Sequence, residues 1–109
     1  MEQLQIKTFK DLSDMTINVA ERFFLARKMK AAYEGDMIAE FDEDEDSYQY
    51  LNKVIKAFDS LTEAEKNLIN NEFFFQSYHR WWESIYSKAT FYRYKKKAML
   101  KFLGAFYNA

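Results

Sequence analysis

The chain has 109 residues, a length that suits one domain. Hydrophobic residues make up 49% and aromatic residues 19%, and there are two glycines, no proline and no cysteine. This composition excludes a disordered chain, a disulfide scaffold and a cysteine-based zinc site, and it favours long helices over a many-stranded sheet.

The net charge of −1 hides a strong division along the chain. Residues 1–77 carry nine Lys and Arg against sixteen Asp and Glu, whereas residues 78–109 carry seven against one. A basic C-terminal third of this kind indicates an anionic partner, most often a nucleic acid. The apolar runs are too short to cross a bilayer and no signal peptide follows Met1, so we expect a soluble cytoplasmic protein with no membrane partner.

The first 46 residues are predicted to form an N-terminal arm, one helix and an acidic linker that pack on the rest of the domain. Apolar residues at helical spacing predict the helix over 16–33, and Gly35 is placed to end it. Residues 40–46 hold six carboxylates in seven positions, which predicts an exposed linker. The alternative is that this acidic segment imitates DNA and covers a cationic face elsewhere in the chain.

Two further helices are predicted over 47–59 and 62–75. Ser47 is a candidate N-cap for the first, whose apolar stripe includes Leu51, Val54 and Phe58. The second opens with Thr62 and Glu65, which have the spacing of a capping box.

The last two predicted helices cover 79–86 and 88–107. The shorter one carries Trp81 and Trp82, which cannot face the same way on a helix, so we expect one in the core and one partly exposed. Ser87 is placed to cap the longer one. The fold class is therefore all-α with five helices and no sheet. The core is expected to join eight residues, namely Leu51, Val54, Phe58, Leu68, Ile69, Phe91, Ala98 and Phe102.

The final helix is amphipathic and basic. Between Lys88 and Lys101 it has six cations and no acid. A helical wheel separates its apolar side from a cationic side. Two residues break the pattern: Lys95 falls among the apolar positions and is expected to snorkel, and Leu100 falls among the cations, where it could contact a partner.

A basic amphipathic helix can be a solvated surface, a membrane-surface helix or a DNA-recognition helix. Its apolar side is needed for the core, which argues against the membrane. The short helix and turn before it match the order of a helix-turn-helix. In that geometry the start of the second helix meets base edges and later cations meet phosphates. The residues expected near bases are Lys88, Thr90, Tyr92 and Arg93, and those expected near phosphates are Arg80, Lys96 and Lys97.

The sequence also resembles a known family over roughly 60 residues. The run YLNKVIKAFDSLTEAEKNLINNEFF at 50–74 resembles the entry to region 4 of bacterial sigma factors, and SKATFYRYKKKAMLKF at 87–102 aligns with the recognition helix of that domain. The start of the latter run also looks like sigma-like phage regulators of the late-transcription activator (ArpU) type. Small mycoplasma-type proteins with an FF, WW and YSKSTYYR pattern are similar to residues 73–93. The resemblance implies a helix-turn-helix domain over 47–109.

No catalytic or cofactor site can be assembled from these residues. His79 is the single histidine and lacks a ligand set, while Asp42, Asp44 and Asp46 imitate an EF-hand whose required Gly and final Glu are absent. We therefore expect no enzyme, no cofactor and no metal. The main hypothesis is a regulator of transcription that binds double-stranded DNA. The alternative is a non-enzymatic interaction module for a protein such as RNA polymerase. The sequence leaves the oligomeric state open.

Overall fold

A computed structural model describes residues 4, 6–36, 42–76 and 78–108. Within these ranges the chain is helical and has no strand, which confirms the all-α prediction. The described residues form four α-helices where five were expected. The elements are α2 (Phe9–Asp36), α3 (Asp42–Asp59), α4 (Glu63–Ile69), the π-helix η1 (Asn70–Phe74) and α5 (Lys88–Tyr107).

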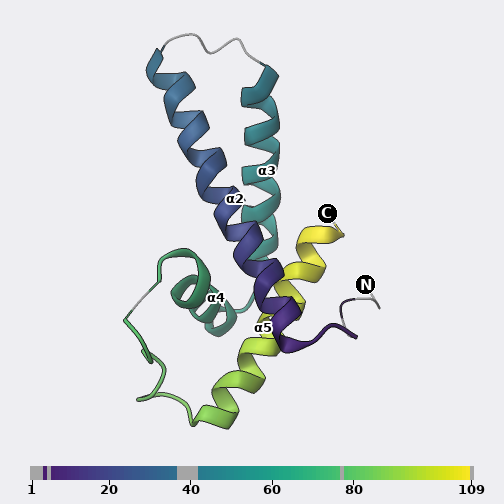
Figure 1. The fold of residues 1–109 in the computed structure, drawn as a ribbon, viewed down its shortest axis with the longest axis vertical. Coiled ribbons are helices and arrows are strands. Elements are labelled where there is room, and N and C mark those ends of the chain that lie inside the picture. Colours follow the sequence, from purple (N-terminus) through teal and green to yellow (C-terminus); the bar gives the residue numbers. More distant parts are fainter. Residues whose placement is uncertain (1–3, 5, 37–41, 77, 109) are drawn as a thin grey trace.

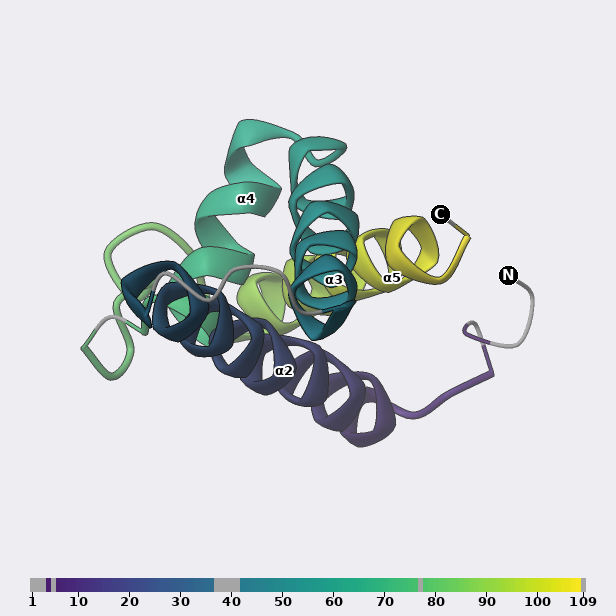
Figure 2. The same ribbon diagram turned by 90° about the horizontal axis from the view of Figure 1, so that it is seen from above.

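The helices form an elongated arrangement that measures 50 × 33 × 22 Å (Figure 1). Helices α2 and α3 make a long antiparallel hairpin, and α5 packs against the lower part of this hairpin. Figure 2 shows α2 and α4 on opposite sides of α5. The C-terminal half of α5 is thus enclosed by its neighbours, whereas its first turns lie at the end of the molecule farthest from the hairpin tip.

Helix α2 begins at Phe9, seven residues before the predicted start at residue 16. Thr8 caps it: the Asp11 amide donates to the Thr8 hydroxyl at 3.1 Å, and the Thr8 amide donates to the Asp11 carboxylate at 3.3 Å. These hydrogen bonds lower the pKa of the Asp11 carboxyl. Much of the predicted arm is therefore helix, and Leu12 is fully buried on it.

Helix α3 begins at Asp42, so the prediction of a linker up to residue 46 is wrong for 42–46, while 40 and 41 lie outside the described residues. Acidic residues in the first turn of a helix interact favourably with its N-terminal partial positive charge, which offsets part of their mutual repulsion. Ser47 is consequently inside the helix and buried, and it is not the N-cap. The helix also runs through the domain boundary proposed at 46/47.

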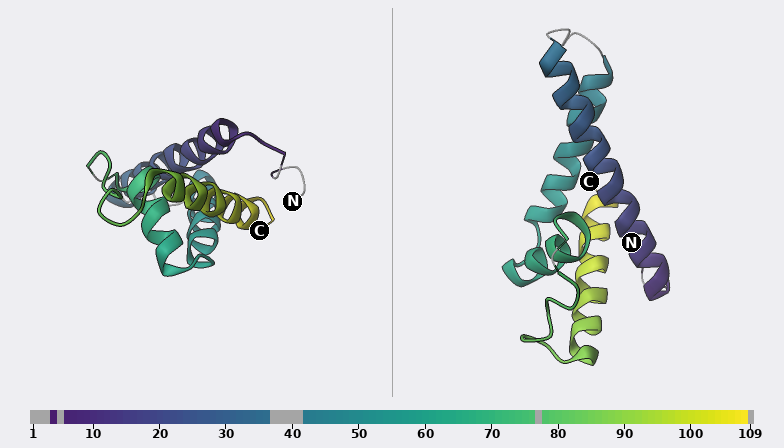
Figure 3. Two further views of the ribbon diagram at one scale, coloured as in Figure 1. Left: turned by 90° about the horizontal axis from the view of Figure 1, so that it is seen from below. Right: turned by 60° about the vertical axis from the view of Figure 1, so that its left-hand side comes forward.

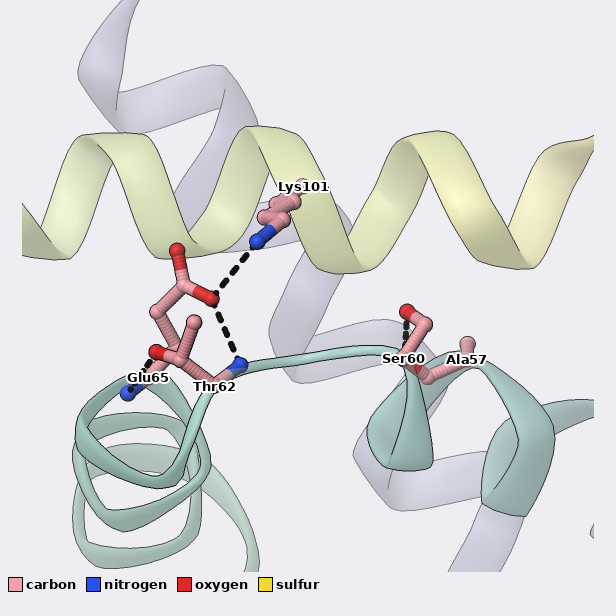
Figure 4. Close-up of polar contacts among 5 residues, drawn as sticks. All are labelled: Ala57, Ser60, Thr62, Glu65 and Lys101. Atoms are coloured by element: carbon pink, nitrogen blue, oxygen red, sulfur yellow. Dashed lines mark hydrogen bonds and ion pairs between the residues drawn. The ribbon is translucent and has the colours of Figure 1, made fainter.

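The capping box predicted at the start of α4 is confirmed (Figure 4). The Glu65 amide donates to the Thr62 hydroxyl at 3.2 Å, and the Thr62 amide donates to Glu65 Oε1 at 2.8 Å. The same oxygen accepts a hydrogen bond from Lys101 of α5 at 3.0 Å. Burial raises the pKa of the Glu65 carboxyl, but the bonds from Thr62 and Lys101 outweigh it, and the net pKa lies below the ordinary value.

After Ile69 the helix widens into η1, where the amide of Phe75 donates to the carbonyl of Asn70 at 2.8 Å. A π-turn contains one residue more than an α-turn, so it changes the direction of the side chains that follow. Phe73 and Phe74 are both buried here, although they are adjacent. Glu72 lies between α5 and the segment that follows η1, and its side chain contacts both.

The helix predicted over 79–86 is wrong, because residues 79–85 form consecutive turns; we call residues 78–86 the turn segment (Figure 3, right). Arg80 has a φ of 60°, in the left-handed region that a right-handed helix cannot include. Turns allow what a helix would prevent, since Trp81 and Trp82 are both buried. The expectation that one of them is partly exposed is also wrong. A helix-turn-helix made from 79–86 and α5 is therefore not formed.

The hydrophobic core joins all of the helices. Six of the eight predicted core residues belong to one buried cluster that also contains Leu4, Leu12 and Val19 from the N-terminal segment. Leu51 is buried outside this cluster, and Phe58 is only partly buried against it. The six predicted residues in the cluster are Val54, Leu68, Ile69, Phe91, Ala98 and Phe102.

Candidate nucleic-acid interface

The two halves of α5 differ in exposure. Of the ten residues from 88 to 97, seven are exposed and only Phe91 is buried. From 98 to 107 five residues are buried. The helix is thus anchored by its second half and presents most of the circumference of its first half to solvent. The predicted helix bounds and the Ser87 N-cap are confirmed here.

The exposed side of α5 consists of two parallel rows of side chains. Residues four apart lie on the same side of a helix, so one row contains Lys88, Tyr92, Lys96 and Leu100, and the other contains Arg93, Lys97 and Lys101. A shallow surface between the rows is lined by residues of both. We call the outward side formed by Lys88, Arg93, Lys96 and Lys97 the cationic face.

The cationic face has few internal partners. Lys101 is paired with Glu65 across to α4, so its charge is used within the fold. Arg93 lies 5.6 Å from the ring of Tyr94. Across the part of the chain that the structure describes, Lys88, Arg93, Lys96 and Lys97 form no ion pair. Their charges are therefore available to an external anion.

The other three predicted site residues are placed differently. Arg80 lies in the turn segment and pairs with Glu83 at 3.0 Å. The Thr90 side chain is engaged in the helix cap, because its hydroxyl accepts a hydrogen bond from the Ser87 hydroxyl at 2.9 Å. The ring of Tyr92 is 41% exposed and makes edge contacts with Phe9 and Trp82.

Lys95 does not snorkel to solvent as expected. Its side chain is 13% exposed, and its ammonium donates to Glu72 Oε1 at 2.7 Å. The second carboxylate oxygen of Glu72 accepts a hydrogen bond from the Trp81 indole at 2.7 Å. The ammonium also lies within 6 Å of three aromatic ring centres, those of Phe9, Phe73 and Phe91. This Lys95–Glu72–Trp81 cluster fastens the turn segment to α5.

Leu100 is partly buried against the core and also lines the shallow surface of the cationic face. It is therefore less exposed than the sequence suggests. An apolar side chain among cations remains compatible with contact to the non-polar parts of a partner.

A cavity of about 440 Å³ lies where the turn segment meets the start of α5. Its walls include Arg80 and Trp82 from the turns and Lys88 and Tyr92 from the helix. The structure thus brings the predicted residues into two groups, one around this cavity and one along the cationic face. Thr90 lines neither the cavity nor the shallow surface.

The acidic and basic parts of the chain lie at opposite ends of the long axis. Figure 1 places the start of α3, residues 42–46, at the tip of the hairpin and the start of α5 at the other end. Within one molecule, the acidic segment is therefore far from the cationic face. This arrangement argues against the alternative that residues 42–46 cover the face in the same chain.

Sequence reasoning missed Glu72 and the pairing of Lys95. A lysine at an apolar helical position was the available signal, because such a residue needs either solvent or a buried carboxylate. Among the described side chains, no group of three or more His, Asp or Glu residues is arranged to hold a metal ion. None of the helices in the described ranges combines the length and the apolar character required to cross a membrane.

Comparisons with family models, with curated proteins and with solved structures give no match to this chain. The function must therefore be argued from the site itself.

Proposed function

We propose that this protein binds double-stranded DNA through the cationic face of α5 and acts as a regulator of transcription. The observation that carries the proposal is the run of four cations without an ion-pair partner in the described structure, on the one part of α5 that projects from the bundle. The resemblance of residues 87–102 to a sigma-factor recognition helix supports the role in transcription.

The dimensions of the face suit a major groove. An α-helix with side chains is about 10–12 Å across, and the major groove of B-DNA is about 12 Å wide. From Lys88 to Lys101 the axial rise is about 20 Å at 1.5 Å per residue. The first half of α5 can enter a groove because few neighbouring side chains cover it, whereas the second half is held in the core.

The charges divide into two roles on this proposal. Lys96 and Lys97 contact phosphates and contribute affinity without sequence preference. Arg93 is the residue best suited to a base edge, because a guanidinium can donate two parallel hydrogen bonds to guanine. Since residues 79–85 are turns, the proposal depends on α5 and its anchoring in the bundle rather than on a helix-turn-helix pair.

The proposal is tested by fluorescence anisotropy with a blunt, labelled duplex in about 0.1 M salt. The variant Lys96→Gln/Lys97→Gln should bind at least about tenfold more weakly than wild type, because it loses two phosphate contacts. The control Lys28→Gln/Lys56→Gln removes the same charge from exposed positions on α2 and α3 and should bind within about twofold of wild type. Equal losses in the two variants would contradict a localised interface.

The second candidate is a protein-interaction module, and one apolar surface favours it. Phe75 is 60% exposed and Ile55 is 47% exposed, and both line a small apolar cavity of about 110 Å³ with Phe58. The two tryptophans, by contrast, are buried. Absence of duplex binding by the folded wild-type protein would favour this module over the DNA-binding function.

A further inference from the structure

The cavity beside the start of α5 has the lining of a small-molecule site. Its volume of about 440 Å³ lies within the range of roughly 300 to 1,000 Å³ that is typical of ligand pockets. It is formed by η1, the turn segment and α5 together. Residues distant in sequence therefore share one concave surface.

Aromatic rings make up one part of the wall, and packing fixes the deepest of them. Trp82 stacks on Phe91 with ring centres 4.4 Å apart and an interplanar angle of 8°. Tyr92 contacts both of these rings by its edge. Tyr78 also lines the cavity and is 75% exposed. Trp82 and Phe91 are buried, so the rings against which a flat aromatic group can stack are those of Tyr78 and Tyr92.

The charges that line the cavity favour an anion. Arg80 and Lys88 are both in the wall, and the only carboxylate among the described lining residues is that of Glu72. Each oxygen of Glu72 already accepts a hydrogen bond, from Lys95 and from Trp81, so its charge is largely compensated. The ion pair of Arg80 with Glu83 uses Nε and leaves the two terminal guanidinium nitrogens outside that pair.

Amide side chains complete the lining. Asn71 and Gln76 come from η1 and the residues just after it, and their amide nitrogens donate within the fold, to Asn67 and to the Glu72 carbonyl. Arg80 has a left-handed φ of 60°, and non-glycine residues in this conformation concentrate at functional sites. The exposed aromatic rings and the cations of the lining match the base and the phosphate of a nucleotide.

We infer that this cavity binds a single nucleotide, with the base against the exposed rings of Tyr78 and Tyr92 and the phosphate at Arg80 and Lys88. The nucleotide can be a free mononucleotide or an unpaired nucleotide at the end of a strand, since both present the same base and phosphate. The inference goes beyond duplex binding: the cavity shares Lys88 with the cationic face, but its lining does not include Arg93, Lys96 or Lys97.

The first arm of the test uses adenosine 5′-monophosphate with the wild-type chain. Binding is followed by calorimetry and by tryptophan fluorescence, to which Trp82 beside the cavity contributes. We expect a dissociation constant below about 1 mM, and at least about tenfold weaker binding of adenosine, ribose 5-phosphate and inorganic phosphate, because each lacks one of the two recognised groups.

Two variants locate the site. Arg80→Gln removes the cation at the phosphate, and Tyr78→Ala removes an exposed ring that makes no core contact. Each should weaken binding of the mononucleotide about tenfold. Lys97→Gln is the matched control for charge and should change it less than twofold. Urea unfolding of each variant identifies any loss that comes from misfolding, and Tyr78→Ala keeps the test valid if Arg80→Gln disturbs the turns.

The second arm distinguishes the two sources of the nucleotide. If the ligand is part of a strand, a duplex with one unpaired adenosine should bind about tenfold more tightly than the blunt duplex, and Tyr78→Ala should remove this preference. A response in either arm that is lost in Tyr78→Ala supports the inference. The inference is overturned if the mononucleotide binds no better than inorganic phosphate and the overhang gives no preference. Blunt-duplex binding by itself bears only on the proposed function.

Discussion

Replacing Glu72 with Gln tests the Lys95–Glu72–Trp81 cluster. The change keeps the size of the side chain but removes the negative charge that the Lys95 ammonium contacts at 2.7 Å. Lys95 and Glu72 are 13% and 18% exposed, so water replaces the lost partner only in part. Breaking a fully buried ion pair costs about 3–5 kcal/mol, and a hydrogen bond to a charged group is worth about 1.5–3 kcal/mol. We expect Glu72→Gln to lower the free energy of unfolding by about 2–3 kcal/mol.

The assay is urea unfolding followed by far-UV circular dichroism and by tryptophan fluorescence. A double-mutant cycle with Lys95→Met isolates the pairwise interaction, because Met keeps most of the length and apolar contacts of Lys without its charge. The double variant should be more stable than the sum of the single losses predicts, by about 1–2 kcal/mol. A loss below about 0.5 kcal/mol in Glu72→Gln, with additive effects in the cycle, would refute the cluster as a structural link.

Three further predictions concern stability. Phe102→Ala should lower the free energy of unfolding by about 3–5 kcal/mol in chemical denaturation, because Phe102 is fully buried. Phe58→Ala should lower it clearly less, because Phe58 is only partly buried. Equal losses would contradict the observed core. Thr8→Ala should lower the free energy of unfolding by about 1 kcal/mol and fray the start of α2, which faster amide hydrogen exchange at residues 9–12 would detect. Unchanged exchange would exclude a cap at Thr8. The Glu65 carboxyl has a lowered pKa, so its ionised form adds stability that is present above its ordinary pKa of 4.5 and is lost as the pH falls through the lower folded value. Glu65→Gln should therefore reduce the loss of stability at acid pH. An unchanged dependence of the unfolding free energy on pH would contradict this role of Glu65.

Local signals in the sequence predicted most of the helices. The Thr62–Glu65 box and the Ser87 cap lie where expected, since each depends on residues within three positions. The same kind of signal at Thr8 and Asp11 was present but used Asp instead of Glu or Gln, so the early start of α2 was missed. The acidic run at 42–46 was interpreted through repulsion alone, which neglects the favourable position of carboxylates at a helix start.

The features that the sequence did not predict depend on contacts between residues far apart in the chain. The residues around Trp81 and Trp82 have a helix-like pattern in the sequence. In the structure Trp81 donates a hydrogen bond to Glu72 and Trp82 stacks on Phe91, so both rings are held inside, which the turns permit and a helix would not. Lys95 was predicted to reach solvent because its partner is 23 residues away on η1. The cationic face was predictable because the spacing of residues along a helix determines which side chains share its exposed side. The cavity was not, because it depends on the path of residues 78–86.

The dependence of blunt-duplex affinity on salt tests most directly whether the cationic face of α5 binds DNA. Each neutralised phosphate contributes about −0.9 to the slope of log affinity against log salt, so the phosphate contacts of Lys96 and Lys97 predict a wild-type slope of about −1.8 or steeper. Lys96→Gln/Lys97→Gln should make the slope shallower by about 1.8, and Lys28→Gln/Lys56→Gln should leave it unchanged. A wild-type slope near zero, or the same slope in the two double variants, would contradict DNA binding by this face.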